Sequence, residues 1–282
     1  MLHALVLKLR SESAAEIPQT HGHQAHALFL RLIEAADPDL ARRLHDPRTR
    51  KPFTVSSVQL PHQPSGRQTR VAPVALLWLR VTLLDDELFG PFMARFLRPG
   101  APALRLGSAT LRVEEVLGTP EGHPLAGCTD FASLLAGAGR EREIQLHFSS
   151  PTAFSLGQAP EGKKRMGVLP EPPLVFDSLL RKWNQFAPPD LALDPALRRT
   201  VEEHSVIAQH ELCTAMFQFP RHLQIGFVGR CRFATPIDDA GRLQMLNALA
   251  DFALYAGVGY KTTMGMGQVR RLGRSSPERQ TR

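Results

Sequence analysis

An α+β fold built from two tandem βαββαβ domains is predicted by three observations. The chain has 282 residues, about twice the length of a usual domain. Each half carries apolar stretches of strand or helix periodicity in the order strand, helix, strand, strand, helix, strand, which is the ferredoxin-like pattern. Turn residues gather between positions 118 and 140, so we place the boundary there and expect domains at 1–125 and 140–272.

The first half opens with a strand from Leu2 to Arg10, in which apolar residues alternate with others. A helix follows from Gly22, and Asp37-Pro38 supplies the N-cap and the first-turn proline of a second helix that ends near His45. The remaining elements expected in this half are strands at Phe53–Leu60 and Val71–Leu84, a helix at Asp85–Phe96 and a strand at Leu111–Leu117.

The second half repeats this order. Its expected elements are a strand at Ile144–Phe148, a helix at Leu174–Phe186, strands at Ser205–Thr214 and Leu223–Phe233, a helix at Gly241–Tyr255 and a strand at Gln268–Leu272. The tail at 273–282 is polar and basic and has no apolar face, so we expect it to be disordered.

The composition favours a polyanion as partner, because the formal net charge is +7 and the sequence pI is about 9.8. Cys128, Cys213 and Cys231 are odd in number and widely scattered, which argues against a disulfide framework or a zinc site and favours buried thiols. The longest apolar stretch, at 71–84, is too short to span a bilayer, and residues 1–10 do not resemble a signal peptide. We therefore expect a cytoplasmic protein without a membrane partner.

A glycine-rich segment at 257–267 is the strongest candidate for binding a ligand. It contains two Gly-x-Gly elements around a lysine: Gly257, Gly259, Lys261, Gly265 and Gly267. Glycine admits positive φ and lets backbone amides approach a phosphate, so the segment is typical of an anion-binding loop. An ordinary turn between helix and strand is the alternative. A dinucleotide fingerprint would need glycine at Thr262, and a Walker loop would need Gly-Lys-Ser/Thr at its end, so neither fits.

Several short segments occur in a characteristic order along the chain. They are Gly22-His23-Gln24, Asp37-Pro38, Leu44-His45, Lys51-Pro52-Phe53-Thr54, Phe148-Ser149-Ser150-Pro151-Thr152 with Phe154, Gly226-Phe227-Val228-Gly229 and the glycine-rich segment. Their order resembles the repeat-associated RNA-binding (RAMP) superfamily of CRISPR systems. Within it, the chain is most similar to the sixth Cas family, the endoribonucleases that cut CRISPR precursor RNA.

This resemblance implies an RNA-binding, metal-independent endoribonuclease without cofactors that cuts CRISPR repeat RNA to give guide RNAs. In the implied reaction a 2′-hydroxyl attacks the adjacent phosphate and leaves a 2′,3′-cyclic phosphate and a 5′-hydroxyl. Such chemistry needs a base, an acid and positive charge near the phosphorus. His45 matches the family's histidine, and Lys51 matches the lysine that stabilises negative charge in the transition state.

The proton-transfer partner of His45 is open, because some relatives carry a tyrosine on the preceding helix and this chain has only Tyr255 and Tyr260. His26 lies at the edge of the apolar stripe of the first expected helix and His23 lies beyond it, so either can fill that role. No cysteine or carboxylate accompanies these histidines at ligand spacing, so no metal site is expected.

Basic residues outside the glycine-rich segment are further candidates for contacts to RNA phosphates, or are solvated charges: Arg230, Arg232, Lys163, Lys164 and Arg165. Aromatic residues make up only 7% of the chain, which favours recognition of backbone and shape over stacking of many bases. A non-catalytic RNA-binding subunit of a CRISPR effector complex is the competing interpretation, and a homodimer also stays open. The pair of His45 and Lys51 favours the enzyme.

Overall fold

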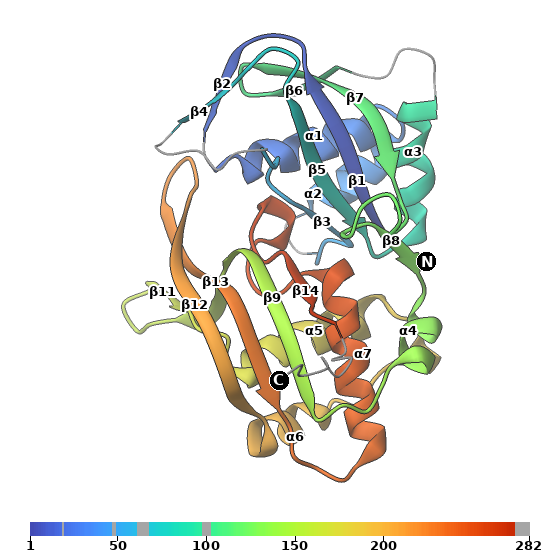
Figure 1. Ribbon diagram of the computed structural model, residues 1–282, viewed down its shortest axis with the longest axis vertical. Helices are drawn as coiled ribbons and strands as arrows, with labels where there is room; N and C mark the ends of the chain where they lie inside the picture. The colour runs from blue at the N-terminus through green and yellow to red at the C-terminus, as the bar shows by residue number, and fades with distance from the viewer. Residues whose placement is uncertain (19, 47–48, 61–67, 98–102, 274–282) are drawn as a thin grey trace, which may run out of the picture.

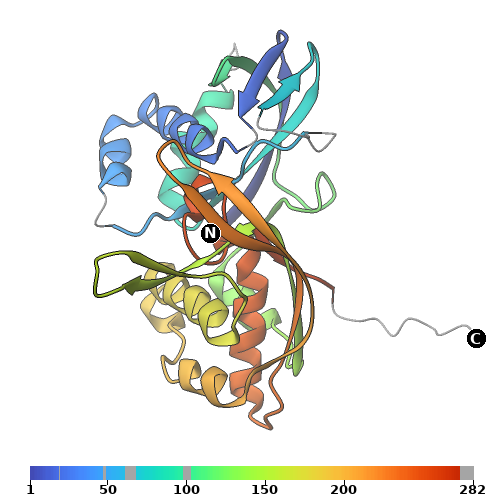
Figure 2. The same ribbon diagram turned by 90° about the vertical axis from the view of Figure 1, so that its left-hand side faces the viewer.

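The computed structural model describes residues 1–18, 20–46, 49–60, 68–97 and 103–273. Two α+β units lie one above the other along the long axis of the molecule (Figure 1). Figure 2, turned by 90°, shows that the helices of both units lie on one side and the sheets on the other. The predicted pair of ferredoxin-like domains is confirmed.

The N-terminal unit has its main elements in the ferredoxin-like order: β1 (Leu2–Ser11), α1 (Gly22–Glu34), β3 (Phe53–Val55), β5 (Leu76–Leu83), α3 (Phe89–Leu97) and β7 (Ala109–Leu117). The strands lie side by side as β3-β5-β1-β7, and every pairing between them is antiparallel. Alternation along β1 buries Leu5, Leu7 and Leu9 in a core shared with α1 and α3.

A second short helix, α2 (Pro38–His45), follows α1 where it was predicted. The side chain of Asp37 caps it by accepting hydrogen bonds from the amides of Asp39 and Leu40, at 3.1 and 2.9 Å. Leu40 and Leu44 are buried, so the apolar face of α2 fixes where the helix lies and where His45 ends it.

The C-terminal unit repeats the motif with β9 (Glu143–Thr152), α5 (Pro172–Phe186), β12 (Val206–Gln218), β13 (Leu223–Ala234), α7 (Ala240–Ala256) and β14 (Val269–Arg271). Its sheet order is β12-β13-β9-β14. Trp183 of α5 is fully buried against Phe131 and Phe252, and its indole donates to the carbonyl oxygen of Leu191 at 2.8 Å. The buried aromatic rings therefore form the centre of this core.

Additional short elements were not predicted from the sequence. They are β2 (Ala15–Pro18), β4 (Gln68–Val71), β6 (Ala103–Leu106), β8 (Gly127–Thr129), α4 (Phe131–Gly137), β10 (Phe154–Gln158), β11 (Lys164–Gly167), η2 (Pro189–Leu191), α6 (Leu197–His204) and η3 (Thr262–Met264), whereas η1 (Asp86–Leu88) lies within the helix expected at Asp85–Phe96. The interval at 118–140 is therefore more than a run of turns, because β8 joins the N-terminal sheet and α4 packs on α7.

Two expected strands are divided or much shorter in the structure. The stretch Val71–Leu84 is wrong as one strand, because Pro73 cannot donate to a ladder and Val74 has a φ of 54°, so β4 ends before this turn and β5 begins after it. The stretch Phe53–Leu60 forms β3 only as far as Val55. Beyond it, Ser56 and Gln59 form isolated bridges.

The end of α7 and the segment after it pack against the N-terminal sheet. The hydroxyl of Thr82 donates to the carbonyl oxygen of Tyr255 at 2.6 Å. The fully buried guanidinium of Arg80 donates to the carbonyl oxygen of Leu125 and the side chain of Gln268, at 2.8 and 2.9 Å, and also to the carbonyl oxygen of Leu254. The bonds to Leu254, Tyr255 and Gln268 join the two units through groups that burial has removed from water.

The cysteines follow the prediction only in part. Cys231 is buried in β13, but Cys128 and Cys213 are exposed because β8 and β12 have an uncovered face, so buried thiols were the wrong expectation for these two. None of the described helices has the length and apolar character needed to cross a membrane. Of the tail at 273–282 that we expected to be disordered, all residues after Gly273 lie outside the described residues.

Candidate active site

The glycine-rich segment at 257–267 forms a tight loop that begins where α7 ends. All four of its predicted glycines have positive φ: Gly257, Gly259, Gly265 and Gly267. Lys261 also lies in the left-handed region, at a φ of 54°. This conformation is the physical reason for glycine at these positions.

The amides of these four glycines are occupied within the protein. They donate to the carbonyl oxygen of Ala253, the hydroxyl of Ser178, the carbonyl oxygen of Val55 and the carbonyl oxygen of Pro151. A Cβ on Gly259 would lie 2.4 Å from the carbonyl oxygen of Ala153, and one on Gly267 would lie 2.1 Å from that of Val258. The glycines therefore permit close packing inside the protein, and the expected reason, free amides for a phosphate, is wrong at these four amides.

The loop lies against the start of α1. A Cβ on Gly22 would lie 1.9 Å from the carbonyl oxygen of Met264, so the helix and the loop are in backbone contact. Nδ1 of His26 lies 3.0 Å from the carbonyl oxygen of Thr263. Because a carbonyl can only accept, Nδ1 carries the proton, and Nε2 of His26 has no hydrogen-bond partner within the described parts of the chain.

The surroundings of His26 disfavour its charged form. Burial lowers the pKa of His26, the hydrogen bond to Thr263 raises it in part, and the positive charges of His45 and Lys51 lower it further. The ring also stacks on Phe53, with centroids 5.6 Å apart. The influence of His45 and Lys51 on this pKa means that the structure brings the three predicted residues together.

His45 is the exposed last residue of α2. Lys51 is half-buried, and its ammonium donates to the carbonyl oxygen of Asp46. Burial lowers the pKa of Lys51, and the carboxylate of Asp46 raises it in part. This hydrogen bond holds Lys51 against the residue that directly follows His45.

The other histidines of α1 have different environments. His21 is 2% exposed; its Nδ1 donates to the carbonyl oxygen of Pro18 and its Nε2 accepts from the amide of Val58, each at 2.8 Å, so it is a structural residue. His23 is half-buried. Burial and the charge of Lys261 lower its pKa, and its buried Nδ1 has no partner among the residues that the structure describes.

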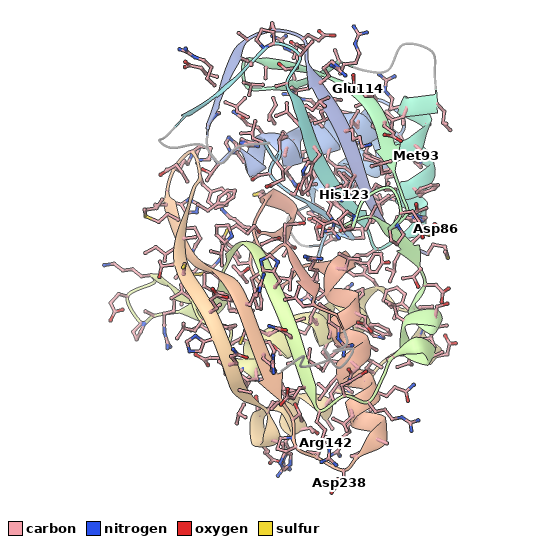
Figure 3. All side chains as sticks on the ribbon, in the orientation of Figure 1. Asp86, Met93, Glu114, His123, Arg142 and Asp238 are labelled. Atoms are coloured by element: carbon pink, nitrogen blue, oxygen red, sulfur yellow. The ribbon has the colours of Figure 1, made fainter. Side chains whose placement is uncertain are left out.

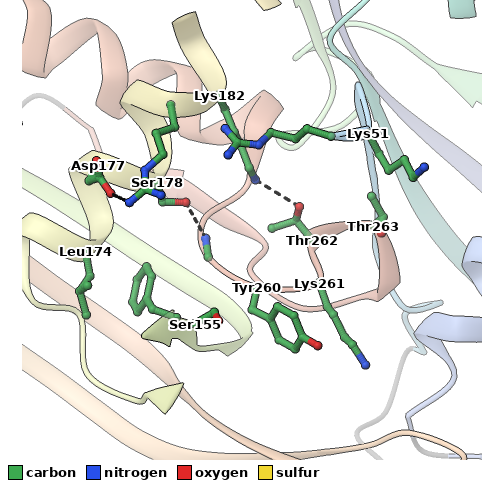
Figure 4. Close-up of a pocket in the computed structure, with 14 residues that line it drawn as sticks. Lys51, Ser155, Leu174, Asp177, Ser178, Lys182, Tyr260, Lys261, Thr262 and Thr263 are labelled. Atoms are coloured by element: carbon green, nitrogen blue, oxygen red, sulfur yellow. Dashed lines mark hydrogen bonds and ion pairs between the residues drawn. The ribbon is translucent and has the colours of Figure 1, made fainter. Parts of the chain in front are cut away.

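A pocket of about 350 Å³ lies between α5, the glycine-rich loop and Lys51 (Figure 4). Cationic side chains contribute much of its lining: Arg50, Lys51, Arg181, Lys182 and Lys261. Arg181 pairs with Asp177, and Tyr260 adds an aromatic wall. Such a pocket suits a phosphate-bearing ligand beside the histidines.

Lys182 fastens the loop from the α5 side. Its ammonium donates to the carbonyl oxygens of Ala256 and Gly257, at 2.7 and 3.2 Å, and to the hydroxyl of Thr262 at 3.1 Å. The two carbonyls end α7, where the helix dipole favours a cation. Burial nevertheless lowers the pKa of Lys182 to about 7, and the charge of Arg50 adds to the effect.

This lowered pKa predicts a pH dependence of stability. Between pH 7 and 10.5 the unfolded chain keeps a proton on Lys182 that the folded chain releases, so this residue makes the free energy of unfolding rise with pH across that window. Denaturant unfolding at pH 7 and pH 9 should show this rise reduced in Lys182→Met. Lys163→Met, which changes an exposed hairpin lysine, should follow the wild type. Identical pH dependence in wild type and Lys182→Met contradicts the prediction.

Some of the predicted RNA-binding residues surround the loop. Lys164 lies over the ring of Tyr260 at 3.7 Å, and Lys261 lies over Phe219 at 3.5 Å, next to His222. Lys163 and Arg165 are exposed beside Lys164, at the turn and in β11 of the hairpin. This hairpin was missed in the sequence, where its lysines stood out only as a charge run.

Arg230 and Arg232 lie elsewhere. Cys231 and Phe233 point into the core beneath the sheet, so Arg230 and Arg232 lie on the opposite, open face of β13. Arg232 pairs with Glu143 at 3.4 Å. The structure therefore does not bring these arginines together with the histidines.

Two tandem ferredoxin-like domains with a glycine-rich loop after the last helix are the arrangement that the family resemblance led us to expect. Two family models match the chain: the CRISPR Cas6 N-terminal domain over residues 1–136 and the CRISPR-associated endoribonuclease Cas6 over residues 146–269. The chain therefore belongs to the Cas6 family of CRISPR-associated endoribonucleases.

Solved structures agree with this assignment. A Cas6 product complex is 34% identical with a TM-score of 0.83, and covers 96% of this chain and 100% of its own. A structure of Thermus thermophilus Cas6 is 32% identical with a TM-score of 0.72, and covers 96% and 98%. A curated Cas6 endoribonuclease of Streptococcus thermophilus is 29% identical over 139 residues, which span 48% of this chain and 56% of that relative.

Proposed function

We propose that this chain cuts CRISPR repeat RNA in the precursor transcript to release guide RNAs. The observation that carries the proposal is His26, whose protonated Nδ1 is fixed by Thr263 and whose Nε2 is left open beside His45 and Lys51. An imidazole whose pKa is lowered and which has one open nitrogen is suited to remove a proton. The product and substrate-mimic complexes of similar Cas6 proteins support RNA as the ligand.

In the proposed reaction, Nε2 of His26 takes the proton of the 2′-hydroxyl at the cut. The freed oxygen bonds to the adjacent phosphorus while the bond from phosphorus to the 5′-oxygen breaks, and His45 gives a proton to that leaving oxygen. The ammonium of Lys51 stabilises the negative charge that develops on the phosphoryl oxygens. The products are a 2′,3′-cyclic phosphate and a 5′-hydroxyl. His26 then releases its extra proton to solvent and His45 takes one up, so both return to their starting states and the reaction balances.

The cationic pocket beside these residues is the proposed path of the RNA backbone. Arg50, Lys261 and the hairpin residues Lys163, Lys164 and Arg165 supply positive charge along it. The glycine-rich loop takes part by presenting Lys261 and by holding His26, with Gly257, Gly259, Gly265 and Gly267 giving it its shape. Arg230 and Arg232, on the open sheet face, would contact a different part of the RNA.

This chemistry makes the cleavage independent of added metal. Cutting of the repeat RNA from the chain's own genome should continue in excess chelator and should stop when the nucleotide before the cut lacks its 2′-hydroxyl. Mapping of product ends should find the cyclic phosphate. A repeat RNA with the 2′-deoxy change one nucleotide away is the control and should be cut normally.

The same experiment distinguishes the proposed enzyme from the competing interpretation. A non-catalytic RNA-binding subunit would bind the repeat RNA and leave it whole under every condition. Cleavage that requires added magnesium, or that persists on the 2′-deoxy substrate, would overturn the proposed chemistry.

A further inference from the structure

A second cavity, of about 150 Å³, lies at the junction of the two units on their open sheet faces. Its lining includes Trp78, Arg80, Leu125, Ser150, Gln268 and Arg270. Trp78 and Arg80 alternate along β5 with Leu77 and Leu79, which belong to the core on the helix side. This cavity therefore opens on the face of the molecule opposite to the pocket beside Lys51.

The side-chain amide of Gln268 is fixed in orientation at the wall of this cavity. Its Oε1 accepts a hydrogen bond from Nη1 of Arg80 at 2.9 Å, so a flipped amide would set two donors against each other. Its backbone is held by hydrogen bonds to Ser149 and Ser150, each at 2.9 Å. The Nε2 of Gln268 is therefore an oriented donor.

That donor has no acceptor. Gln268 is only 6% exposed, and its Nε2 lacks a hydrogen-bond partner within the described ranges of the chain. A buried donor without an acceptor is unfavourable, so such a group points to something that binds there. The missing partner must carry a hydrogen-bond acceptor.

The size and walls of the cavity suit a flat ring. A cavity of about 150 Å³ is known to hold a single benzene-sized ring. The indole of Trp78 provides an aromatic wall, and His123, labelled at the junction in Figure 3, lies 5.0 Å from it. Leu125 and Leu254 add apolar surface.

Positive charge lies at the edge of the same cavity. Arg270 lines it, and His147 and Arg230 share the open sheet face beside Arg270. Burial lowers the pKa of His147, and the charges of Arg270 and Arg230 lower it further, which shows that the three groups are close. A phosphate bound here would relieve their mutual repulsion.

We propose that this cavity binds one unpaired pyrimidine base of the repeat RNA, far from the cut. A carbonyl oxygen of the base accepts from Nε2 of Gln268, Trp78 faces the ring, and Arg270 holds an adjacent phosphate. The inference rests on the proposed function because it takes repeat RNA as the ligand. It adds a site of base recognition that the catalytic residues do not supply.

The sharpest test is Gln268→Glu. Glutamate keeps an oxygen to accept from Arg80 and adds a charge pair with that arginine, so the protein should fold and melt at or above the wild-type temperature. The donor is replaced by a carboxylate oxygen, which repels a carbonyl. Affinity for repeat RNA, measured by filter binding, should fall by about tenfold or more.

Gln185→Glu is the matched control, because it makes the same charge change at an exposed position of α5, outside the cavity and away from the open sheet face. It should bind RNA within about twofold of the wild type. Trp78→Leu is a second variant that removes the aromatic wall without adding charge, and it should also weaken binding.

Repeat RNAs with one abasic pyrimidine at a time identify the base. At one position, the abasic change should lower the affinity of the wild-type protein about as much as Gln268→Glu lowers affinity for the intact RNA. The Gln268→Glu protein and the wild type should then bind this abasic RNA equally well. Wild-type affinity in Gln268→Glu, or an equal loss in Gln185→Glu, overturns the inference and leaves the cavity to water. A wild-type protein that neither binds nor cuts repeat RNA overturns the proposed function as well.

Discussion

Replacing His45 by alanine should slow single-turnover cleavage of repeat RNA by roughly a hundredfold or more, the usual scale of general acid catalysis. The imidazole is exposed at the end of α2, so its removal takes no packing away from the core. RNA affinity should therefore stay close to that of the wild type. The measurement is the rate of product formation with enzyme in excess, together with filter binding.

The chain offers a matched control in His204, which is the exposed last residue of α6 just as His45 is of α2. His204→Ala should cut at the parental rate. A His45→Ala protein that cuts as fast as His204→Ala would show that the chemistry lies elsewhere.

The same assay assigns the second proton-transfer residue. His26→Ala should lose rate on a similar scale, because Nε2 of His26 is the open nitrogen beside His45. His23→Ala should lose less, because Lys261 is the charge that lowers the pKa of His23, whereas His45 and Lys51 lower that of His26. A large loss in His23→Ala with none in His26→Ala would reverse this assignment.

Replacing Gly22 by alanine should lower both stability and cleavage. The new Cβ would lie 1.9 Å from the carbonyl oxygen of Met264, so α1 and η3 must move apart. Overpacking of this kind costs about 1–3 kcal/mol. The movement also breaks the contact between His26 and Thr263, and a misplacement near 1 Å can cost about a hundredfold in rate. Thermal unfolding and single-turnover cleavage measure the two effects.

Gly90→Ala is the control for this change. Gly90 lies in α3, and a Cβ there would meet nothing within 4 Å. Alanine in a helix is favoured over glycine by about 0.5–1 kcal/mol, so this variant should be as stable as the wild type or slightly more so, and fully active. If Gly22→Ala behaved like Gly90→Ala, the backbone contact between α1 and η3 would not matter for catalysis.

The elements whose formation depends on residues nearby in the chain could be predicted from the sequence. The apolar spacing of α1, the cap at Asp37 and the alternation of β1 depend on neighbours along the chain, and each lies where it was expected. The β10–β11 hairpin and α6 were missed because β10 and β11 have few buried side chains and α6 buries only three, which left no strong apolar period to detect.

The candidate site was only partly accessible from the sequence. The order of short motifs selected His45 and Lys51, and the structure places them beside His26. The carbonyl of Thr263 that orients His26 is 237 positions away in sequence, so no local pattern could reveal it. The role of Lys182 could have been suspected from the sequence. It lies three residues after the buried Leu179, on the stripe of α5 that faces the core, and a lysine is rare at such a position unless its charge has hydrogen-bond partners.

The distance along the chain between His26 and its carbonyl partner also sets when the site can exist during synthesis. His26, His45 and Lys51 leave the ribosome early, but the loop that holds His26 is made some two hundred residues later. A nascent chain that has folded its first domain therefore carries the proposed catalytic side chains in an unassembled state. The proposed ability to cut RNA would therefore arise only after the glycine-rich loop has been made and has docked on α1, and a chain interrupted before Thr263 would leave transcripts intact.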